Sequence, residues 1–162
     1  MAKIIQPPAP LEEGFSIFLA GSIEMGTAED WQARIIARLS AYDVLIFNPR
    51  RSAWDPTWAQ TPDNPPFREQ VEWELAALER ANLIVMYLDP ATKSPISLLE
   101  LGLFGRGGKM VVCCPRGFWR KGNVDIVCAR YGIAQVDSLE EVIEWVVERL
   151  EQTAGSRLVS FE

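Results

Sequence analysis

The stretch Ser94-Pro95-Ile96-Ser97-Leu98-Leu99-Glu100-Leu101-Gly102-Leu103-Phe104-Gly105 predicts a helix in which a single carboxylate stands among apolar residues. Serine followed by proline is typical of a helix N-cap and first turn, so we expect the helix to begin here. Leucine on nearly every side of the helix predicts that it is buried. A carboxylate in that position must be paired, protonated or used in chemistry, because burying an unpaired charge is costly. The alternative is a structural Glu100 that reaches solvent or caps the helix start.

Short apolar runs alternate with helical patterns on both sides of this stretch. Such runs are typical of parallel strands that are covered on both faces. The sequence therefore predicts an α/β fold, a flavodoxin-like or Rossmann-like three-layer sandwich around a mainly parallel five-stranded sheet. Predicted strands cover residues 15–20, 44–47, 83–88, 110–114 and 133–136. Predicted helices cover residues 27–42, 67–81, 124–130 and 138–152, in addition to the helix that begins at Ser94.

One domain is expected over residues 15–152, because the whole chain of 162 residues is long enough for a single core. Residues 1–14 contain three prolines and are predicted to form a flexible arm. Residues 153–162 are expected to form a C-terminal tail that docks on the body or on another subunit. The segment 48–66 holds two tryptophans and five prolines, and we interpret it as a lid or pocket wall. A packed surface loop without a ligand role is the alternative.

The composition excludes several classes of protein. The net charge of −6 argues against a nucleic-acid polymer as partner, and no apolar run is long enough to span a membrane. No secretory leader is recognisable, and three cysteines without CxxC spacing indicate reduced thiols in the cytoplasm. The sequence has no histidine, which removes serine- or cysteine-histidine catalysis and histidine metal sites. Carboxylates are then the expected acid, base or nucleophile, and no metal or cofactor is expected.

A second carboxylate, Glu74, falls on the apolar stripe that is predicted for the helix over residues 67–81. Gln70 lies one turn before Glu74, so the two side chains share a surface. The apolar members of the stripe are Phe67, Val71, Leu75 and Leu78. In parallel sheets, ligands bind beyond the carboxyl ends of the strands. The segments that follow the predicted strands are 21–22, 48–51, 89–100 and 115–123, so the unusual polar residues gather at one edge.

The chain resembles the nucleoside 2-deoxyribosyltransferase superfamily and its deoxynucleotide N-hydrolase relatives, roughly over residues 15–150. Phe18-Leu19-Ala20-Gly21-Ser22-Ile23 is similar to the first strand and Gly-Ser turn of that family, and Leu99-Glu100-Leu101-Gly102 is similar to its nucleophile motif. Glu74 stands where relatives have a pocket carboxylate, usually Asp. Ser94 lies six residues before Glu100, where relatives have an Asp or Ser that contacts the ligand. The deoxyribosyltransferase-like branch is the most similar.

The resemblance implies cleavage of the N-glycosidic bond of a nucleoside through a glycosyl-enzyme on Glu100, with Glu74 binding or protonating the leaving base. It also implies a role in nucleotide salvage and a homo-oligomer in which Asn123 completes the site of a neighbouring subunit. The implied substrate contacts come from Gly21, Ser22, Asn48, Ser94 and Asn123. Either Trp54, Trp58 or Trp73 could stack on the base, with core packing as the alternative.

Three activities stay open at this point. The sugar could be transferred to a second nucleobase, or water could resolve the intermediate, as in a deoxynucleoside 5′-monophosphate N-glycosidase. The third alternative is a module that binds a nucleotide derivative without catalysis. All three predict small-molecule partners, namely a nucleoside or nucleotide and, for transfer, a free nucleobase.

Overall fold

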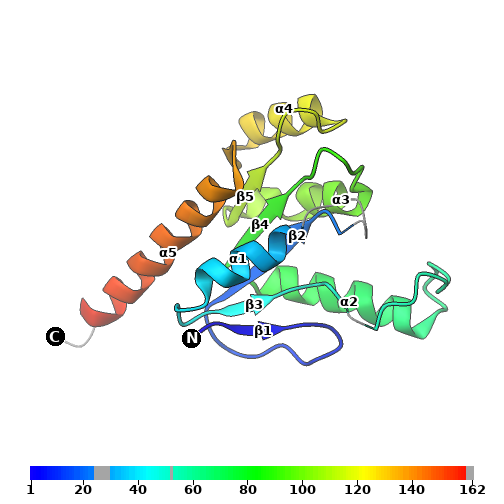
Figure 1. Ribbon diagram of the computed structural model, residues 1–162, viewed down its shortest axis with the longest axis horizontal. Helices are drawn as coiled ribbons and strands as arrows, with labels where there is room; N and C mark the ends of the chain where they lie inside the picture. Colours follow the sequence, from blue (N-terminus) through cyan, green and yellow to red (C-terminus); the bar gives the residue numbers. More distant parts are fainter. Residues whose placement is uncertain (24–29, 52, 160–162) are drawn as a thin grey trace.

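The computed structural model describes residues 1–23, 30–51 and 53–159 and shows a six-stranded sheet between two layers of helices (Figure 1). Neighbouring strands are all parallel, in the order β1-β3-β2-β4-β5-β6. The α/β class and the three-layer arrangement predicted from the sequence are confirmed. The strands are β1 (Lys3–Ile5), β2 (Ser16–Gly21), β3 (Leu45–Phe47), β4 (Leu83–Tyr87), β5 (Met110–Cys113) and β6 (Ala134–Val136).

Helices connect the strands and cover both faces of the sheet (Figure 1). Helices α2, α3 and α4 lie on one face, and α1 and α5 lie on the other. Among the described residues, no helix is both long and apolar enough to cross a membrane. The helices are α1 (Trp31–Leu39), α2 (Pro65–Arg80), α3 (Pro95–Phe104), the short 3-10 helix η1 (Gly105–Gly107), α4 (Lys121–Tyr131) and α5 (Leu139–Val159).

Strand β2 supplies side chains to two separate apolar cores, because successive side chains of a strand point to opposite faces. Phe18 and Ala20 pack in the core under α2, α3 and α4, whereas Ile17 and Leu19 pack in the core under α1 and α5. All four side chains are almost completely buried. Burial on both faces explains why the central strands read as continuous apolar runs in the sequence.

The order of the last five strands, β3-β2-β4-β5-β6, is the flavodoxin-like order. In this topology the chain reverses direction across the sheet between β2 and β4. The connection after β2 and the connection after β4 therefore leave toward opposite faces of the sheet. Ligands bind in the crevice between these two connections in such sheets. The fold therefore points to the residues that follow Gly21 and Tyr87 as the centre of any ligand site.

The sheet has six strands, so the predicted count of five is wrong. Residues 3–5, which were expected to lie in a flexible arm, form the edge strand β1 and pair with residues 45–47 of β3. The proline-rich segment after β1 is also held, because the indole of Trp73 donates a hydrogen bond to the Ala9 carbonyl over 2.8 Å. The prolines that closely follow residues 3–5 indicated an arm and hid this short strand.

Two helices differ in length from their predictions. Helix α5 continues seven residues beyond the predicted end at residue 152, to Val159. Helix α1 ends at Leu39 rather than at residue 42, and its N-cap is Asp30, whose carboxylate accepts a hydrogen bond from the Ala33 amide over 3.1 Å. The predicted helix start at Thr27 falls outside the described residues.

Helix α3 is not buried on all sides, which corrects the prediction from its leucine content. Ile96, Leu99 and Leu103 are 58–60% exposed and lie along one stripe of the helix. Ser97, Glu100 and Leu101 form the buried side. Glu100 therefore stands beside an exposed apolar stripe, at the boundary between protein interior and surface.

Helix α2 presents a different face to the sheet from the predicted stripe. Its buried residues are Gln70, Trp73, Ala77 and Leu78, whereas Leu75 is exposed. Trp73 sets this orientation, because its ring packs against Phe18 and Phe47 in the core. The rotation places Glu74 beside Gln70, at the edge of the buried face.

Candidate functional site

The centre of the site is the turn after β2, and glycine is required there. Gly21 has φ +129°, and a Cβ at this position would lie 2.1 Å from the Tyr87 carbonyl oxygen of β4. The absence of a side chain lets the two strands approach, and the Ser22 amide then donates to that carbonyl over 3.0 Å. The Gly-Ser turn therefore fixes Ser22 at the carboxyl end of the neighbouring strand.

Three buried hydroxyl groups, those of Ser22, Thr92 and Ser94, form what we call the hydroxyl cluster. Their oxygens lie 2.8 Å (Ser22–Thr92), 2.7 Å (Ser22–Ser94) and 2.7 Å (Thr92–Ser94) apart. The cluster joins the loops after β2 and β4, at the position where the topology predicts a ligand. The Asp89 amide also donates to the Ser22 hydroxyl over 2.8 Å, so the cluster is tied to the backbone.

The hydroxyl cluster is also anchored to the loop after β4 through Thr92. Thr92 donates its proton to the Asp89 carbonyl, which accepts only, over 2.9 Å. The three hydroxyl groups are therefore held by one another and by the backbone of Asp89.

Ser94 begins α3 in a strained backbone conformation. The predicted helix start is confirmed, because Pro95 is the first residue of α3 and Ser94 is its N-cap. Its side chain makes no capping hydrogen bond, and its φ of 46° and ψ of 54° lie in the left-handed region that residues with a Cβ rarely occupy. Strain of this kind persists where surrounding contacts fix it and is common at functional sites. Here the contacts are those of the hydroxyl cluster.

Glu100 lies on the buried side of α3 and is 8% exposed. Burial, with a further contribution from the negative charge of Glu74, raises the pKa of Glu100 from its ordinary value of 4.5 to about 8. The two carboxylates lie on different helices and are near enough for the charge of Glu74 to affect the pKa of Glu100. That they belong to one site stays a prediction.

Glu74 is held by Gln70 one helical turn earlier. Gln70 Nε2 donates to Glu74 Oε1 over 2.8 Å and to the Pro49 carbonyl over 2.9 Å. Burial raises the pKa of Glu74, and the hydrogen bond from Gln70 partly offsets this rise. Gln70 therefore connects the loop after β3 with the carboxylate on α2.

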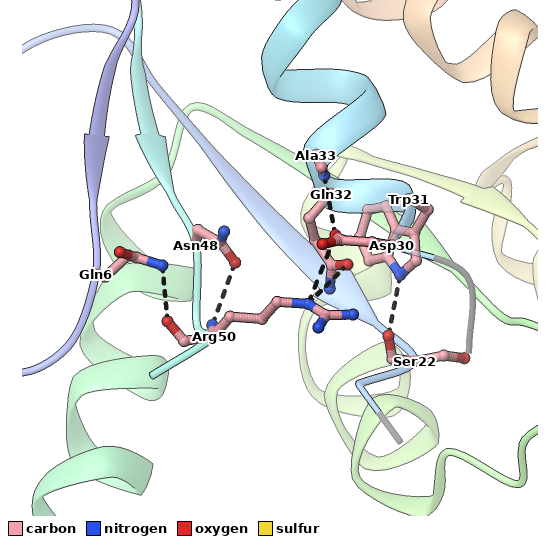
Figure 2. A network of polar contacts seen from close by, with 8 residues as sticks. All are labelled: Gln6, Ser22, Asp30, Trp31, Gln32, Ala33, Asn48 and Arg50. Carbon is pink, nitrogen blue, oxygen red and sulfur yellow. Dashed lines mark hydrogen bonds and ion pairs between the residues drawn. The ribbon is translucent and has the colours of Figure 1, made fainter. Parts of the chain in front are cut away.

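Asn48 and Arg50 extend the site along the ends of β1 and β3 (Figure 2). Buried Asn48 accepts from the Arg50 amide over 3.2 Å, and Arg50 Nε donates to Gln32 Oε1 over 3.1 Å. Figure 2 shows the Arg50 side chain reaching from the β3 end toward the start of α1, where Asp30 lies 3.8 Å from Arg50 Nε. The indole of Trp31 donates to the Ser22 carbonyl over 3.0 Å and anchors α1 to the turn after β2.

The tryptophans have different surroundings. Trp73 packs in the core against Phe47, which is the alternative that the sequence left open for it. Trp54 and Trp58 are half-buried and pack edge to face with ring centres 5.0 Å apart. The Arg51 guanidinium lies 5.4 Å from the centre of the Trp58 ring. This packing gives the segment 48–66 a local order of its own, and its role as a lid stays a prediction.

Asn123 is exposed in the first turn of α4. Helix α4 follows the loop after β5, so Asn123 belongs to the same edge of the sheet as the other predicted residues. Among the hydrogen bonds of the described residues, none joins it to Glu74 or Glu100 of its own chain. Its position on the surface agrees with the expectation that it acts on another subunit, which stays a prediction.

Sequence reasoning did not select Thr92 and Gln32. Thr92 is the third member of the hydroxyl cluster, and its signal was its place two residues before Ser94 in the loop after β4. Gln32 is completely buried on α1, where only the three-dimensional contact with Arg50 reveals its role. Within the described part of the chain, no group of three acidic or cysteine side chains could hold a metal ion.

A surface depression of about 630 Å³ lies on the opposite side of α2 from Glu74. Its lining residues are Leu11, Trp73, Ala76, Glu79 and Arg80. The lining contains neither Glu74 nor Glu100 and no member of the hydroxyl cluster. We therefore assign the candidate site to the polar groups at the carboxyl edge of the sheet and not to this depression.

Comparison with known proteins supports the family resemblance. The model of the nucleoside 2-deoxyribosyltransferase-like family matches residues 14–118, from the start of β2 to the loop before α4. The match includes every predicted site residue except Asn123. No curated protein matches the chain. On the family match, which spans well over half of its length, the chain belongs to the nucleoside 2-deoxyribosyltransferase-like family.

Proposed function

We propose that this chain cleaves the N-glycosidic bond of (deoxy)nucleosides and transfers the sugar to a second nucleobase. The observation that carries the proposal is a pair of carboxylates, half-buried Glu74 and buried Glu100, which lie on different helices and interact electrostatically. The family relates the chain to nucleosides and nucleobases as substrates.

In the first step, a Glu100 carboxylate oxygen forms a bond with the anomeric carbon of the sugar while the bond from that carbon to the base nitrogen breaks. The electron pair of the broken bond leaves with the base, and a proton from Glu74 neutralises it. In the second step, a nitrogen of another nucleobase attacks the same carbon, the ester to Glu100 breaks, and Glu74 recovers its proton. The developing positive charge on the sugar is stabilised by the Glu100 carboxylate.

The two carboxylates divide these roles if they share one proton. Each negative charge raises the cost of the other, so the pair keeps a proton at neutral pH. Burial favours the proton on Glu100, so the reactive arrangement forms when that proton passes to Glu74 and leaves the charge on Glu100. The hydrogen bond from Gln70 holds the Glu74 carboxyl group in position. Glu100 is held in position by its place on the buried side of α3.

The hydroxyl cluster is the proposed sugar site. It brings three hydroxyl groups together, and Ser22 and Ser94 lie at the switch point between β2 and β4. Gly21 contributes close backbone approach, and Asn48 lines the neighbouring end of β3. These contacts orient the sugar so that its anomeric carbon meets Glu100.

We further propose that the active form is a homo-oligomer in which Asn123 contributes to the site of a neighbouring subunit. The exposed position of Asn123 supports this, since it leaves the side chain accessible to a second chain. The exposed apolar stripe of Ile96, Leu99 and Leu103 beside Glu100 gives α3 a surface that association would cover.

The decisive experiment is incubation of the protein with a mixture of 2′-deoxynucleosides and free bases, followed by chromatography of the products. Exchange of bases is expected for the wild type and loss of at least about 1,000-fold in rate for Glu100→Ala, since the covalent step is removed. Undiminished exchange in Glu100→Ala would refute the role of Glu100. Ligand-induced thermal stabilisation without any turnover would favour a binding module.

Hydrolysis of a deoxynucleoside 5′-monophosphate is the second candidate. Arg50 favours it, because this cation lies between the ends of β1 and β3 and the start of α1, close to the proposed sugar site (Figure 2). Release of free base from 2′-deoxynucleoside 5′-monophosphates without an acceptor base would support this candidate. Equal rates with and without the 5′-phosphate would exclude it.

A further inference from the structure

Gln70 carries a hydrogen-bonding group that the protein does not use. Its side chain is 6% exposed, yet Oε1 is buried without a hydrogen-bond partner among the described residues. A buried acceptor without a donor is costly, so such atoms in proteins usually meet a ligand or water. Gln70 lies beside Glu74, in the proposed site of the leaving base.

The orientation of the Gln70 amide follows from its neighbours. The Pro49 oxygen is a carbonyl and can only accept, so the Gln70 atom 2.9 Å from it must be Nε2. The second proton of Nε2 goes to Glu74 Oε1 at 2.8 Å. Both donor positions are thereby used, and the remaining Oε1 can only accept.

Glu74 and Gln70 together present a donor beside an acceptor. In the proposed reaction, Glu74 carries a proton for a ring nitrogen of the leaving base. A base that fits both groups has a basic ring nitrogen next to an N–H donor. Adenine has this pattern at N7 and its 6-amino group, and cytosine has it at N3 and its 4-amino group. Hypoxanthine has an oxygen in place of the amino group, and that oxygen would face another acceptor.

We infer that Gln70 is the residue that selects amino-bearing nucleobases, with Oε1 accepting from the exocyclic amino group while Glu74 engages the adjacent ring nitrogen. This inference rests on the proposed function for the position of the base and names the substrate class of that site. A residue that only held Glu74 in place would affect all bases alike.

The test compares 2′-deoxyadenosine with 2′-deoxyinosine, which differ in the group at purine position 6. We expect the wild-type kcat/KM to favour deoxyadenosine by about tenfold or more, since a missing donor leaves Gln70 Oε1 unpaired. In Gln70→Met, which has similar length but no acceptor, the ratio should fall to within about threefold. A ratio that survives in Gln70→Met, or an equal loss for both substrates, would overturn the inference.

Gln32→Met is the matched control, because Gln32 is also buried and its Nε2 has no hydrogen-bond partner among the described residues. Gln32 contacts Arg50 rather than Glu74, so this variant should keep the wild-type ratio. A second test changes the substrate and keeps the wild-type protein. It uses the 2′-deoxyriboside of purine, which has no substituent at position 6. Its kcat/KM should fall close to that of deoxyinosine, and this test holds even where Gln70→Met fails to fold.

A binding arm separates this inference from the proposed function. Calorimetric titration of the wild type with adenine and with hypoxanthine requires no turnover. Tighter binding of adenine without catalysis would support Gln70 as a selector and refute the transferase proposal. Base exchange with equal affinity for adenine and hypoxanthine would support the transferase and refute the selector.

Discussion

At the scale of single residues, the ionised form of Glu100 is costly in the folded chain, and this has a consequence for stability. The folded pKa of about 8 lies above the ordinary value of 4.5, so the folded state holds a proton that the unfolded state loses between these values. The free energy of unfolding contributed by this group is therefore fully present below pH 4.5 and is lost as pH rises to about 8.

The corresponding prediction concerns Glu100→Gln, which is neutral at every pH. We expect this variant to be more stable than the wild type by about 1–3 kcal/mol at pH 8, with the difference vanishing near pH 4. Urea unfolding at several pH values measures it. Glu144→Gln on the exposed side of α5 is the control and should change the free energy of unfolding by less than about 0.5 kcal/mol. A pH-independent difference would contradict the assigned burial.

The proton shared by Glu74 and Glu100 predicts the pH dependence of the reaction. If the active state has one proton on the pair, kcat/KM should fall as that proton is lost, with a basic limb near pH 8. In Glu74→Gln the repulsion is removed, so the pKa of Glu100 should decrease and the basic limb should disappear along with most of the activity. Initial rates between pH 5 and about 9.5 measure this. A wild-type profile that stays flat across that range would refute the shared proton.

At the scale of elements, the end of α2 depends on a residue from the start of β5. The Lys109 ammonium group precedes β5 and donates to the Leu78, Glu79 and Ala81 carbonyls over 2.8, 3.1 and 2.8 Å. Carbonyls at a helix C-terminus lack partners within the helix and attract positive charge. Lys109 therefore fixes the end of the helix that carries Gln70 and Glu74.

We expect Lys109→Met to lower the free energy of unfolding by about 1–3 kcal/mol, because three carbonyls lose a charged donor. The control is Arg68→Met on the same helix, where the ion pair with Glu72 is exposed and its loss should cost less than about 0.5 kcal/mol. Chemical unfolding at neutral pH measures both variants. Similar values for the two would show that the cap contributes little.

The elements also show which features of the sequence were readable. The serine-proline start of α3 and the apolar runs of β2, β4 and β5 predicted their elements, because local patterns determine them. The face of α2 was predicted wrongly, because Leu75 and Trp73 compete for burial and only the packing of Trp73 against Phe47 decides the orientation. Strand β1 was missed because three residues pair with β3 only in the folded sheet.

The candidate site was readable to the extent that chain order determines the edge of a parallel sheet. Glu100 and Glu74 were selected as carboxylates on apolar helices, whereas the roles of Ser22 and Ser94 came from the family resemblance. Thr92 and Gln32 were not selected, because their contacts with Ser22 and with Arg50 exist only in the folded chain. The unused Oε1 of Gln70 is likewise visible only once Pro49 fixes the amide orientation.

At the scale of the whole molecule, the two parts of the proposed site differ in whether one chain can supply them. The hydroxyl cluster, Glu74 and Glu100 are assembled within a single chain, whereas Asn123 is exposed on α4. If Asn123 acts on a neighbouring subunit, each site of an oligomer uses Glu100 from one chain and Asn123 from another. Mixing two variants that are each inactive, one at Glu100 and one at Asn123, should then restore activity.

Mixing Glu100→Ala with Asn123→Ala tests this arrangement. In a two-chain site, a heterodimer of these variants has one site that lacks both groups and one intact site, so activity should return to about a quarter of the wild-type value after random exchange of equal amounts of the two chains. Light scattering before and after mixing verifies that oligomers form and exchange. The variant Leu99→Asp, which places a charge on the exposed stripe of α3, should weaken association if that stripe is the interface. Exchange of subunits without any recovery of activity would place Asn123 and Glu100 in the same chain's site or would remove Asn123 from the site altogether.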